Sequence, residues 1–544
     1  MLTARPSRLA LLFWALLAVG CQEVPAQDSG GALMPEQAAY DVTFYDLAVA
    51  VHPERRTIDG ELAVTAEVTD SLDVLVLNLH RRLAVTGAWP TGTPTRSLSV
   101  ERRADGNQLW ISLPAATAPG DRIRVTVAYE GRPRVAPNPP WDGGFTWART
   151  PGGAPWIATS CQTAGADLWW PVKDHPSDEP DSMDVAITVP DSLVAASNGR
   201  LQSVERASDS TETYRWEVST SINPYAVTLN VAPYARIDTT YRSVAGTDVP
   251  VSFYALRSDS ATAAAQLPQF LDQVRFLEET LGPYPFRADK YGIAQTPFLG
   301  MEHQTLIAYG HNFTTGGLGY DAGFDALHFH ELAHEWYGNC LTVRDWKDFW
   351  LHEGTATYLE ALYAEALRGR EGYQQVIRHH RRQIANRVPI ARRAPTTAQE
   401  AYNRDVYYKG ALVLHTLRHT IGEEAVTTLL RRFVAPESEA PACRHVDTED
   451  FLRQAEAISG RSLDAFAETY LYQASLPRLD TTRVGQTLSL QWARADTAFS
   501  VPVPVEVAGE SRVVSMSGGV GELTLPSDTA TVRIDPDGWV LRAQ

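Results

Sequence analysis

The pentapeptide His330-Glu331-Leu332-Ala333-His334 is the segment whose residue types and spacing point most directly to chemistry. On a helix, residues four positions apart differ by about 40° around the axis and about 6 Å along it, so both imidazoles can reach one metal ion. Glu331 then points elsewhere, towards a water molecule on that metal. The segment therefore predicts a metal site, against the alternative of an exposed helix surface that happens to carry His and Glu.

A third ligand is predicted at Glu353, which follows His334 after eighteen intervening residues and opens a second expected helix. Two histidines and one glutamate with an open fourth position form the catalytic type of zinc site, not the structural type. His328 lies about 160° from His330 around the helix, so we expect it to pack against its neighbours. His352 competes with Glu353 in principle, but an imidazole ligand there would require Glu353 to face away.

The elements that must position these residues change in character along the chain. From Tyr40 to about Pro233, short runs alternate between polar and apolar residues and end at turn signals, which predicts an antiparallel β domain. Within it, Val135 to Pro155 is rich in Pro and Gly and is expected to be a surface loop. After about Asp259 apolar residues recur every three to four positions, which predicts helices. The alternation of polar and apolar residues returns after about Ser475, which predicts strands. The predicted helices span Ser260–Leu281, Phe324–Tyr337, Thr355–Leu367, Gly372–Arg387, Val406–Thr420 and Thr448–Ser459.

These changes predict a multidomain α+β fold in five parts. We expect an export signal at 1–20, a tether at 21–35, a β domain at 36–240, a mainly helical catalytic domain at 241–475 and a small β domain at 476–544.

The composition excludes several classes of protein. With 544 residues, 44% of them hydrophobic and 14 of them Trp, the chain is long and apolar enough to fold around a large core. Its net charge of -17 repels phosphate backbones, which argues against a nucleic-acid partner. The four cysteines, Cys21, Cys161, Cys340 and Cys443, show no paired spacing, so a cysteine-based zinc module is excluded and at most one internal disulfide is expected.

The N-terminus predicts export from a bacterial cell. Arg5 and Arg8 precede the apolar run Leu9–Val19, which has the order of an export signal and is too short to span a bilayer. The run ends at Cys21 in a sequence that resembles a bacterial lipobox, although Ala18 stands where Leu is usual. We expect a periplasmic or cell-envelope protein, either free or anchored to the membrane by a lipid on Cys21.

The motifs together resemble the M1 family of zinc aminopeptidases, the gluzincins that include aminopeptidase N and leukotriene A4 hydrolase. The resemblance extends over nearly the whole chain after about Tyr40, and its pieces occur in the family's order. They are Cys161–Thr163, Ser197–Gly199, Gly282–Phe286, Gly300–His303, His330–Asn339, Asp345–Gly354 and Tyr407–Gly410. The resemblance implies a thermolysin-like catalytic domain with one zinc ion on His330, His334 and Glu353, and Glu331 as the general base.

The same resemblance implies which residues bind the substrate. Glu302, within Gly300-Met301-Glu302, is similar to the glutamate that holds the free α-amine, and a fixed carboxylate near the metal suits an ammonium group. Gln162 is similar to the glutamine that lines the first side-chain pocket. Leu299 and His303 depart from the family's Gly and Asn, which alters the loop that carries Glu302.

Tyr407 resembles the tyrosine that donates to the developing oxyanion, because the family's Tyr-x-Lys-Gly spacing to Lys409 and Gly410 selects it over Tyr408. The sequence therefore predicts a zinc-dependent aminopeptidase that acts on peptides with a free N-terminus. Two alternatives remain. One is a thermolysin-type endopeptidase, against which the Gly-Met-Glu segment and the preceding β domain argue. The other is a binding module without activity, against which the retained ligands, base and tyrosine argue.

Overall fold

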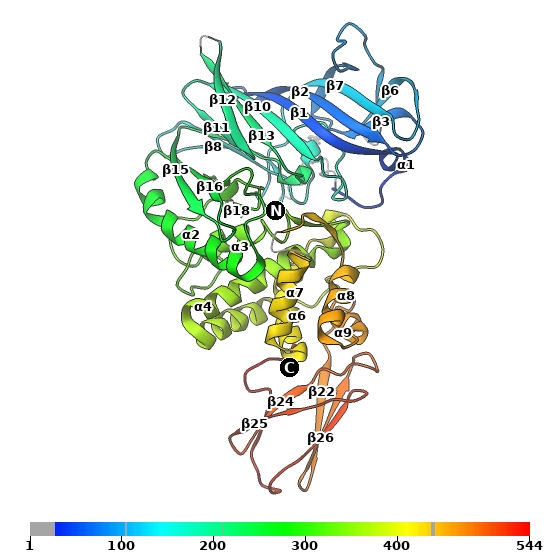
Figure 1. Cartoon of the computed structure of the whole chain (residues 1–544), viewed down its shortest axis with the longest axis vertical. Helices are drawn as coiled ribbons and strands as arrows, with labels where there is room; N and C mark the ends of the chain where they lie inside the picture. The colour runs from blue at the N-terminus through cyan, green and yellow to red at the C-terminus, as the bar shows by residue number, and fades with distance from the viewer. Residues whose placement is uncertain (1–27, 104–105, 209, 437–440, 544) are drawn as a thin grey trace, which may run out of the picture.

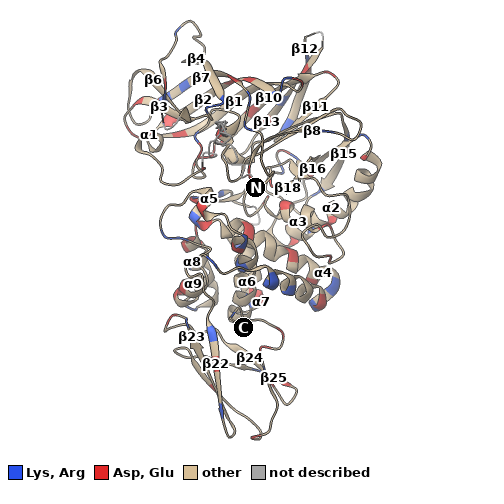
Figure 2. Ribbon diagram, turned by 180° about the vertical axis from the view of Figure 1, so that it is seen from behind, with Lys and Arg blue, Asp and Glu red and all other residues tan. Residues whose placement is uncertain are grey.

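The computed structural model describes residues 28–103, 106–208, 210–436 and 441–543. Three parts follow one another along the long axis of the molecule: β-sheets, then helices, then a small β structure at the C-terminal end (Figure 1). This order confirms the predicted fold class. Charged residues of both signs are interspersed along all three parts (Figure 2). The predicted export signal and Cys21 lie outside the described residues.

A seven-stranded sheet forms the body of the N-terminal part, in the order β12-β13-β10-β1-β2-β7-β4. Buried side chains alternate with more exposed ones along much of β1 and β2, as the period-two pattern predicts. The pairings are antiparallel except that of β1 with β10, which is parallel. The strands are β1 (Tyr40–His52), β2 (Thr57–Val68), β4 (Leu83–Pro90), β7 (Arg122–Gly131), β10 (Ser182–Pro190), β12 (Arg200–Ser208) and β13 (Thr211–Val218).

Two smaller sheets complete this part, in the orders β3-β6-β5 and β11-β14-β9-β8. Their strands are β3 (Leu72–Asn78), β5 (Val100–Arg103), β6 (Gln108–Thr117), β8 (Gly144–Arg149), β9 (Pro155–Ser160), β11 (Val194–Ser197) and β14 (Leu229–Ala232).

Strand β8 corrects the expectation that Val135 to Pro155 is a surface loop. Gly143 and Gly144, at the start of this strand, do not form a turn. They let neighbouring backbone segments approach closely. A Cβ atom on Gly143 would lie 2.3 Å from the carbonyl oxygen of Ser160, and one on Gly144 would lie 2.5 Å from that of Arg134.

The first described residues pack between the β and helical parts. Ser29 is buried, and its carbonyl oxygen accepts a 2.8 Å hydrogen bond from the backbone N–H of Ala398 in α5 (Ala398–Ala401). Gly30 has a φ of 78°, and a Cβ there would lie 2.4 Å from the Trp346 ring. The described end of the predicted tether, 28–35, is therefore held against the folded body before it leads into α1 (Pro35–Ala38).

The helical part is built on one side of a mixed sheet in the order β15-β16-β17-β19-β18. This sheet begins at Tyr234, so it includes residues on both sides of the predicted boundary at 240. The strands are β15 (Tyr234–Arg242), β16 (Asp248–Leu256), β17 (Tyr291–Gln295), β18 (Gly300–Met301) and β19 (Ile307–Tyr309). The longer helices are α2 (Ser260–Leu281), α3 (Ala326–Ala333), α4 (Trp350–Gln383), α6 (Arg404–Ile421), α7 (Glu423–Val434), α8 (Thr448–Ser459) and α9 (Asp464–Tyr470).

The two helices predicted at 355–367 and 372–387 form the single element α4, which has a break at Gly369, where φ is 64°. Beyond α3, β20 (Leu341–Val343) pairs in parallel with β21 (Arg444–Val446). A disulfide between Cys340 and Cys443 joins the residues that precede these strands, and Cys161 is a buried free thiol. The segment after α3 is thus tied to the segment before α8.

The C-terminal part consists of two three-stranded sheets, β22-β23-β26 and β25-β24-β27. It packs against α6: the Trp539 ring stacks on His415 with centroids 4.8 Å apart, and Thr416 donates a hydrogen bond to the Trp539 carbonyl oxygen. The strands are β22 (Arg478–Val484), β23 (Thr487–Ala493), β24 (Val503–Val507), β25 (Glu510–Val514), β26 (Val520–Thr524) and β27 (Val532–Ile534). Among the described residues, no helix combines the length and the apolar character that a membrane span requires.

Helices α4 and α6 cross in direct backbone contact. A Cβ on Gly354 would lie 2.8 Å from the Cα of Gly410 and 3.0 Å from the carbonyl oxygen of Val406. Because both positions are glycines, the two axes come closer than packed side chains would allow. The crossing brings the first turn of α4, with Glu353, next to the first turn of α6, with Tyr407.

We expect Gly354→Ala to lower the free energy of unfolding by about 1–2 kcal/mol, because overpacking exceeds the gain in helix propensity. Urea denaturation measures this change. Gly152→Ala is the control, because a Cβ there meets only the Thr150 hydroxyl at 3.8 Å. An unfolding free energy of Gly354→Ala at or above that of the unchanged protein would contradict the tight crossing.

Candidate active site

Helix α3 presents both histidines of the predicted pair to one point. The Asp325 side chain caps the helix by accepting the His328 backbone N–H, and the helix ends at Ala333, earlier than predicted. His334 retains helical dihedral angles as the C-cap residue. The Nε2 atoms of His330 and His334 consequently lie 3.1 Å apart.

Glu353, in the first turn of α4, closes the set. Its Oε2 atom lies 3.3 Å from each histidine Nε2, so the three atoms form a nearly equilateral triangle. Tetrahedral zinc with bonds of about 2.0–2.1 Å separates its ligand atoms by about 3.3–3.4 Å. All three side chains are buried, and Glu353 Oε2 has no hydrogen-bond donor among the described residues. The donor set therefore fits one tetrahedral metal ion.

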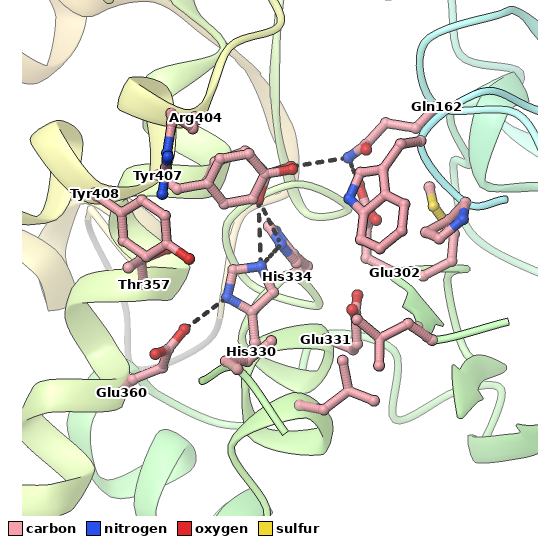
Figure 3. A pocket seen from close by; sticks show the side chains of 18 of the residues that line it. Gln162, Glu302, His330, Glu331, His334, Thr357, Glu360, Arg404, Tyr407 and Tyr408 are labelled. Atoms are coloured by element: carbon pink, nitrogen blue, oxygen red, sulfur yellow. Dashed lines mark hydrogen bonds and ion pairs between the residues drawn. The ribbon is translucent and has the colours of Figure 1, made fainter. Parts of the chain in front are cut away.

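The other ring nitrogen of each histidine is anchored, which aims Nε2 at the triangle. His330 Nδ1 lies 2.9 Å from Glu360 Oε1, and His334 Nδ1 lies 2.9 Å from the Tyr337 carbonyl oxygen. Figure 3 shows the contact between His330 and Glu360 as a dashed line. The Tyr320 hydroxyl in turn donates a 2.6 Å hydrogen bond to Glu360 Oε2. Such partners fix the tautomer and the ring orientation of a metal ligand. Sequence reasoning missed Glu360 and Tyr320.

Buried carboxylates gather around the two imidazoles of the site. Burial favours the neutral form of Glu353, yet the facing imidazoles of His334 and His330 hold the pKa of its carboxyl well below its usual range. Burial raises the pKa of Glu331 to about 8, and the neighbouring carboxylate of Glu302 adds to this shift. A cation bound here would offset the cost of ionising these buried carboxylates.

Glu331 faces the edge strand β18. A Cβ on Gly300 would lie 2.5 Å from Glu331 Oε1, so the absence of a side chain at this position gives the carboxylate its space. Glu302 and Glu331, with His334, form a second set of donor atoms within 4.8 Å of one another. Glu331 thus lies beside the His330–His334–Glu353 triangle without being part of it.

Glu302 is joined to that triangle through Gln162. The Gln162 side-chain N–H₂ donates to Glu302 Oε1 and, at 3.0 Å, to Glu353 Oε1. The backbone carbonyl of Glu302 accepts a 2.9 Å hydrogen bond from Asn339 at the end of the α3 segment. The sequence predicted that Gln162 lines a side-chain pocket; the structure adds that its amide bridges two carboxylates from different elements.

Tyr407 lies beside His330, one of the three predicted metal ligands. Its ring centroid is 6.0 Å from that of His330, and its hydroxyl lies 3.4 Å from the hydroxyl of Tyr402. Tyr408 instead packs against His380, with ring centroids 5.5 Å apart. The ammonium of Lys409 donates to the carbonyl oxygen of Gln473 at 2.7 Å, which is a structural contact.

The two competing histidines lie elsewhere. His328 stacks on Phe270 with centroids 3.6 Å apart and bonds to Tyr291 and Gln273, which confirms that it packs in the core. His352 Nε2 accepts the backbone N–H of Val343 at 2.9 Å. His303, one of the departures from the family pattern, is buried, and burial lowers its pKa to about 3.

A cavity of about 340 Å³ opens above these residues. Its walls include every predicted site residue: Gln162, Gly300, Met301, Glu302, His330, Glu331, His334, Glu353 and Tyr407. They also include residues that sequence reasoning did not single out, among them Trp141, Tyr402 and Arg404. Trp141 lies well before the motif at Cys161–Thr163, whereas Tyr402 and Arg404 lie just before the motif at Tyr407–Gly410. No residue pattern marks these three, and only their position in the fold reveals them.

Comparison with known families agrees with this arrangement. The profile of the peptidase M1 N-terminal domain matches residues 42–225, and that of the peptidase family M1 domain matches residues 273–470. The chain belongs to peptidase family M1. This confirms the family that the sequence motifs indicated.

Known M1 proteins are similar in sequence and in structure. Aminopeptidase N of Streptomyces lividans is 26% identical over 296 residues, which are 50% of this chain and 34% of that protein. This chain spans only 20% to 38% of the length of the curated relatives it matches.

An M1 zinc metallopeptidase from Deinococcus radiodurans has a crystal structure similar to this one. Its TM-score is 0.67 at 25% identity, and the match covers 81% of this chain and 95% of that one. A mutant of that enzyme bound to a Tyr-Ser-Ala substrate gives the same TM-score of 0.67 at 24% identity, with 82% and 98% of the two chains covered.

We expect Glu360→Gln to weaken Zn²⁺ binding about tenfold, because it removes the charge that orients His330. Competition with a fluorescent chelator measures the affinity. Glu371→Gln, an exposed change on the same helix, is the control and should bind like the unchanged protein. Equal affinity of both variants would show that Glu360 does not support the metal ligand.

Proposed function

We propose that this M1 peptidase is a zinc-dependent aminopeptidase that removes N-terminal residues from peptides. The observation that carries the proposal is the position of Glu302. Its carboxylate is buried and is linked to Glu353 of the metal-ligand set through the Gln162 amide, which donates a hydrogen bond to each. A fixed negative charge beside the reacting centre suits the α-ammonium of a free N-terminus and offers nothing to an internal peptide segment. The similarity to aminopeptidase N supports the same assignment.

The proposed mechanism assigns one task to each side chain. A zinc ion on His330, His334 and Glu353 would supply a Lewis acid that polarises the scissile carbonyl and acidifies a water molecule. Glu331 takes the proton of the attacking water and passes it to the leaving amine. The Tyr407 hydroxyl donates to the carbonyl oxygen as negative charge develops on it. Glu302 holds the α-ammonium, which sets the register at one residue per cycle.

We propose further that the protein is exported and acts in the cell envelope. The support is the sequence alone: Arg5 and Arg8 before Leu9–Val19, and the lipobox-like segment that ends at Cys21. These residues lie outside the described part of the chain.

A panel of amino-acyl reporter substrates tests the aminopeptidase proposal. Free amino-acyl substrates should be cleaved with a kcat/KM at least tenfold above that of their N-acetylated forms, because the ammonium gains a charge-assisted bond of about 1.5–3 kcal/mol. A chelator should abolish both activities. Glu302→Ala should erase the discrimination. Cleavage of blocked peptides at internal bonds with equal efficiency would instead establish the thermolysin-type endopeptidase, and no hydrolysis of any substrate would favour a binding module.

Two variants separate the proposed base from the proposed ligands. Glu331→Gln should keep about one zinc per chain and lose turnover by about 10²–10⁴-fold, because the base does not coordinate the metal. Glu353→Ala should lose both, because two histidines alone hold the ion poorly. Metal content by elemental analysis and kcat on one substrate measure the difference. Loss of zinc from Glu331→Gln would place this residue among the ligands and refute the assignment.

A further inference from the structure

The side chains that line the catalytic cavity include more acidic than basic groups. Four carboxylates line it, from Glu302, Glu331, Glu353 and Glu360. Among the described residues that form its walls, Arg404 is the single arginine or lysine. The proposed function gives each carboxylate a role: Glu353 binds the metal, Glu360 orients His330, Glu331 is the base and Glu302 binds the α-amine. It gives Arg404 none.

Arg404 lies at the far side of the reacting centre from the amine site. In Figure 3, Glu302 and Gln162 lie on one side of the histidine pair, and Arg404 lies on the other side, beside Tyr407 and Tyr408. Arg404 is the first residue of α6, about one turn before Tyr407. It therefore also lies at the positive end of the helix dipole.

The guanidinium of Arg404 is available to a ligand. The side chain is exposed, and its Nη2 atom donates to the side-chain oxygen of Gln383, a neutral partner. No carboxylate of the described residues forms an ion pair with it. Its carbon Cζ lies 5.8 Å from the ring centroid of Tyr408, which forms the adjoining wall. The positive charge at this end of the cavity is thus uncompensated.

A bound peptide would run from the amine site towards this charge. With the α-ammonium at Glu302 and the scissile carbonyl under Tyr407, the rest of the peptide continues to the side where Arg404 lies. An extended chain advances about 3.3–3.6 Å per residue, and three residues of helix rise about 4.5 Å. A C-terminal carboxylate one or two residues beyond the scissile bond therefore comes within reach of the arginine side chain.

We infer that Arg404 binds the C-terminal carboxylate of di- and tripeptides, so that the enzyme recognises both charged ends of a short peptide. A guanidinium suits this task, because its planar N–H groups match the two oxygens of a carboxylate. The inference rests on the proposed aminopeptidase function, which places the amine at Glu302.

The test compares Ala-Ala-Ala with its C-terminal amide, Ala-Ala-Ala-NH₂, as the ratio of their kcat/KM values within each variant. The unchanged protein should favour the free acid about five- to tenfold at low ionic strength, and less in high salt, because an exposed ion pair is screened. Arg404→Gln should bring the ratio close to one, and Arg404→Lys should retain part of it. Arg368→Gln is the matched control: Arg368 is also exposed and bonded to a glutamine, but lies outside the cavity walls, so its ratio should stay that of the unchanged protein.

Equal cleavage of acid and amide by the unchanged protein, or an undiminished ratio in Arg404→Gln, would overturn the inference and leave Arg404 as a link between α6 and the end of α4. An amino-acyl p-nitroanilide, which has no carboxylate, separates this failure from failure of the proposed function. Chelator-sensitive release of p-nitroaniline supports the aminopeptidase even when the carboxylate preference is absent.

Discussion

The constraint on which the site depends is the burial of several carboxylates around two imidazoles. Glu302, Glu331 and Glu353 are all buried, and their oxygens lie within 4.8 Å of a ring nitrogen of His334. Buried negative charges are costly unless a positive charge compensates them. The cluster therefore favours a metal ion at the His330–His334–Glu353 triangle and an ammonium group at Glu302. The same charge that holds the metal also selects the positive end of a peptide.

The fold assembles this cluster by bringing backbones together where side chains would keep them apart. Gly300 makes room for the Glu331 carboxylate, and the contact of Gly354 with Gly410 lets α4 cross α6. Each of these glycines lies beside a residue of the site: Glu302, Glu353 and Tyr407. Each motif thus contains both a functional side chain and the glycine that makes room for the site. This explains why the motifs occur as contiguous segments.

The sequence predicts the parts of the site that depend on local periodicity. Spacing along α3 predicted that His330 and His334 share a face, and the order of the motifs predicted the family. Glu360 was not found, because its contact with His330 depends on how α3 packs against α4. Tyr402 was not found, because no local pattern marks it. The bridging hydrogen bonds of Gln162 likewise depend on the packing of the β part against α4.

Two features of the fold were also beyond sequence reasoning. The pairing of Cys340 with Cys443 spans 103 residues and follows from β20 meeting β21, which no spacing rule gives. Strand β8 was mistaken for a loop because glycines serve close approach as well as turns.

The position of the metal tests the account most directly, since two donor sets share His334. Crystals of the zinc-loaded protein, measured on both sides of the zinc absorption edge, locate the ion by anomalous scattering. The account predicts one peak per chain at bonding distance, about 2.0–2.2 Å, from His330 Nε2, His334 Nε2 and a Glu353 oxygen. A peak bonded instead to Glu302, Glu331 and His334 would contradict it, because the proposed base and amine receptor would then be metal ligands.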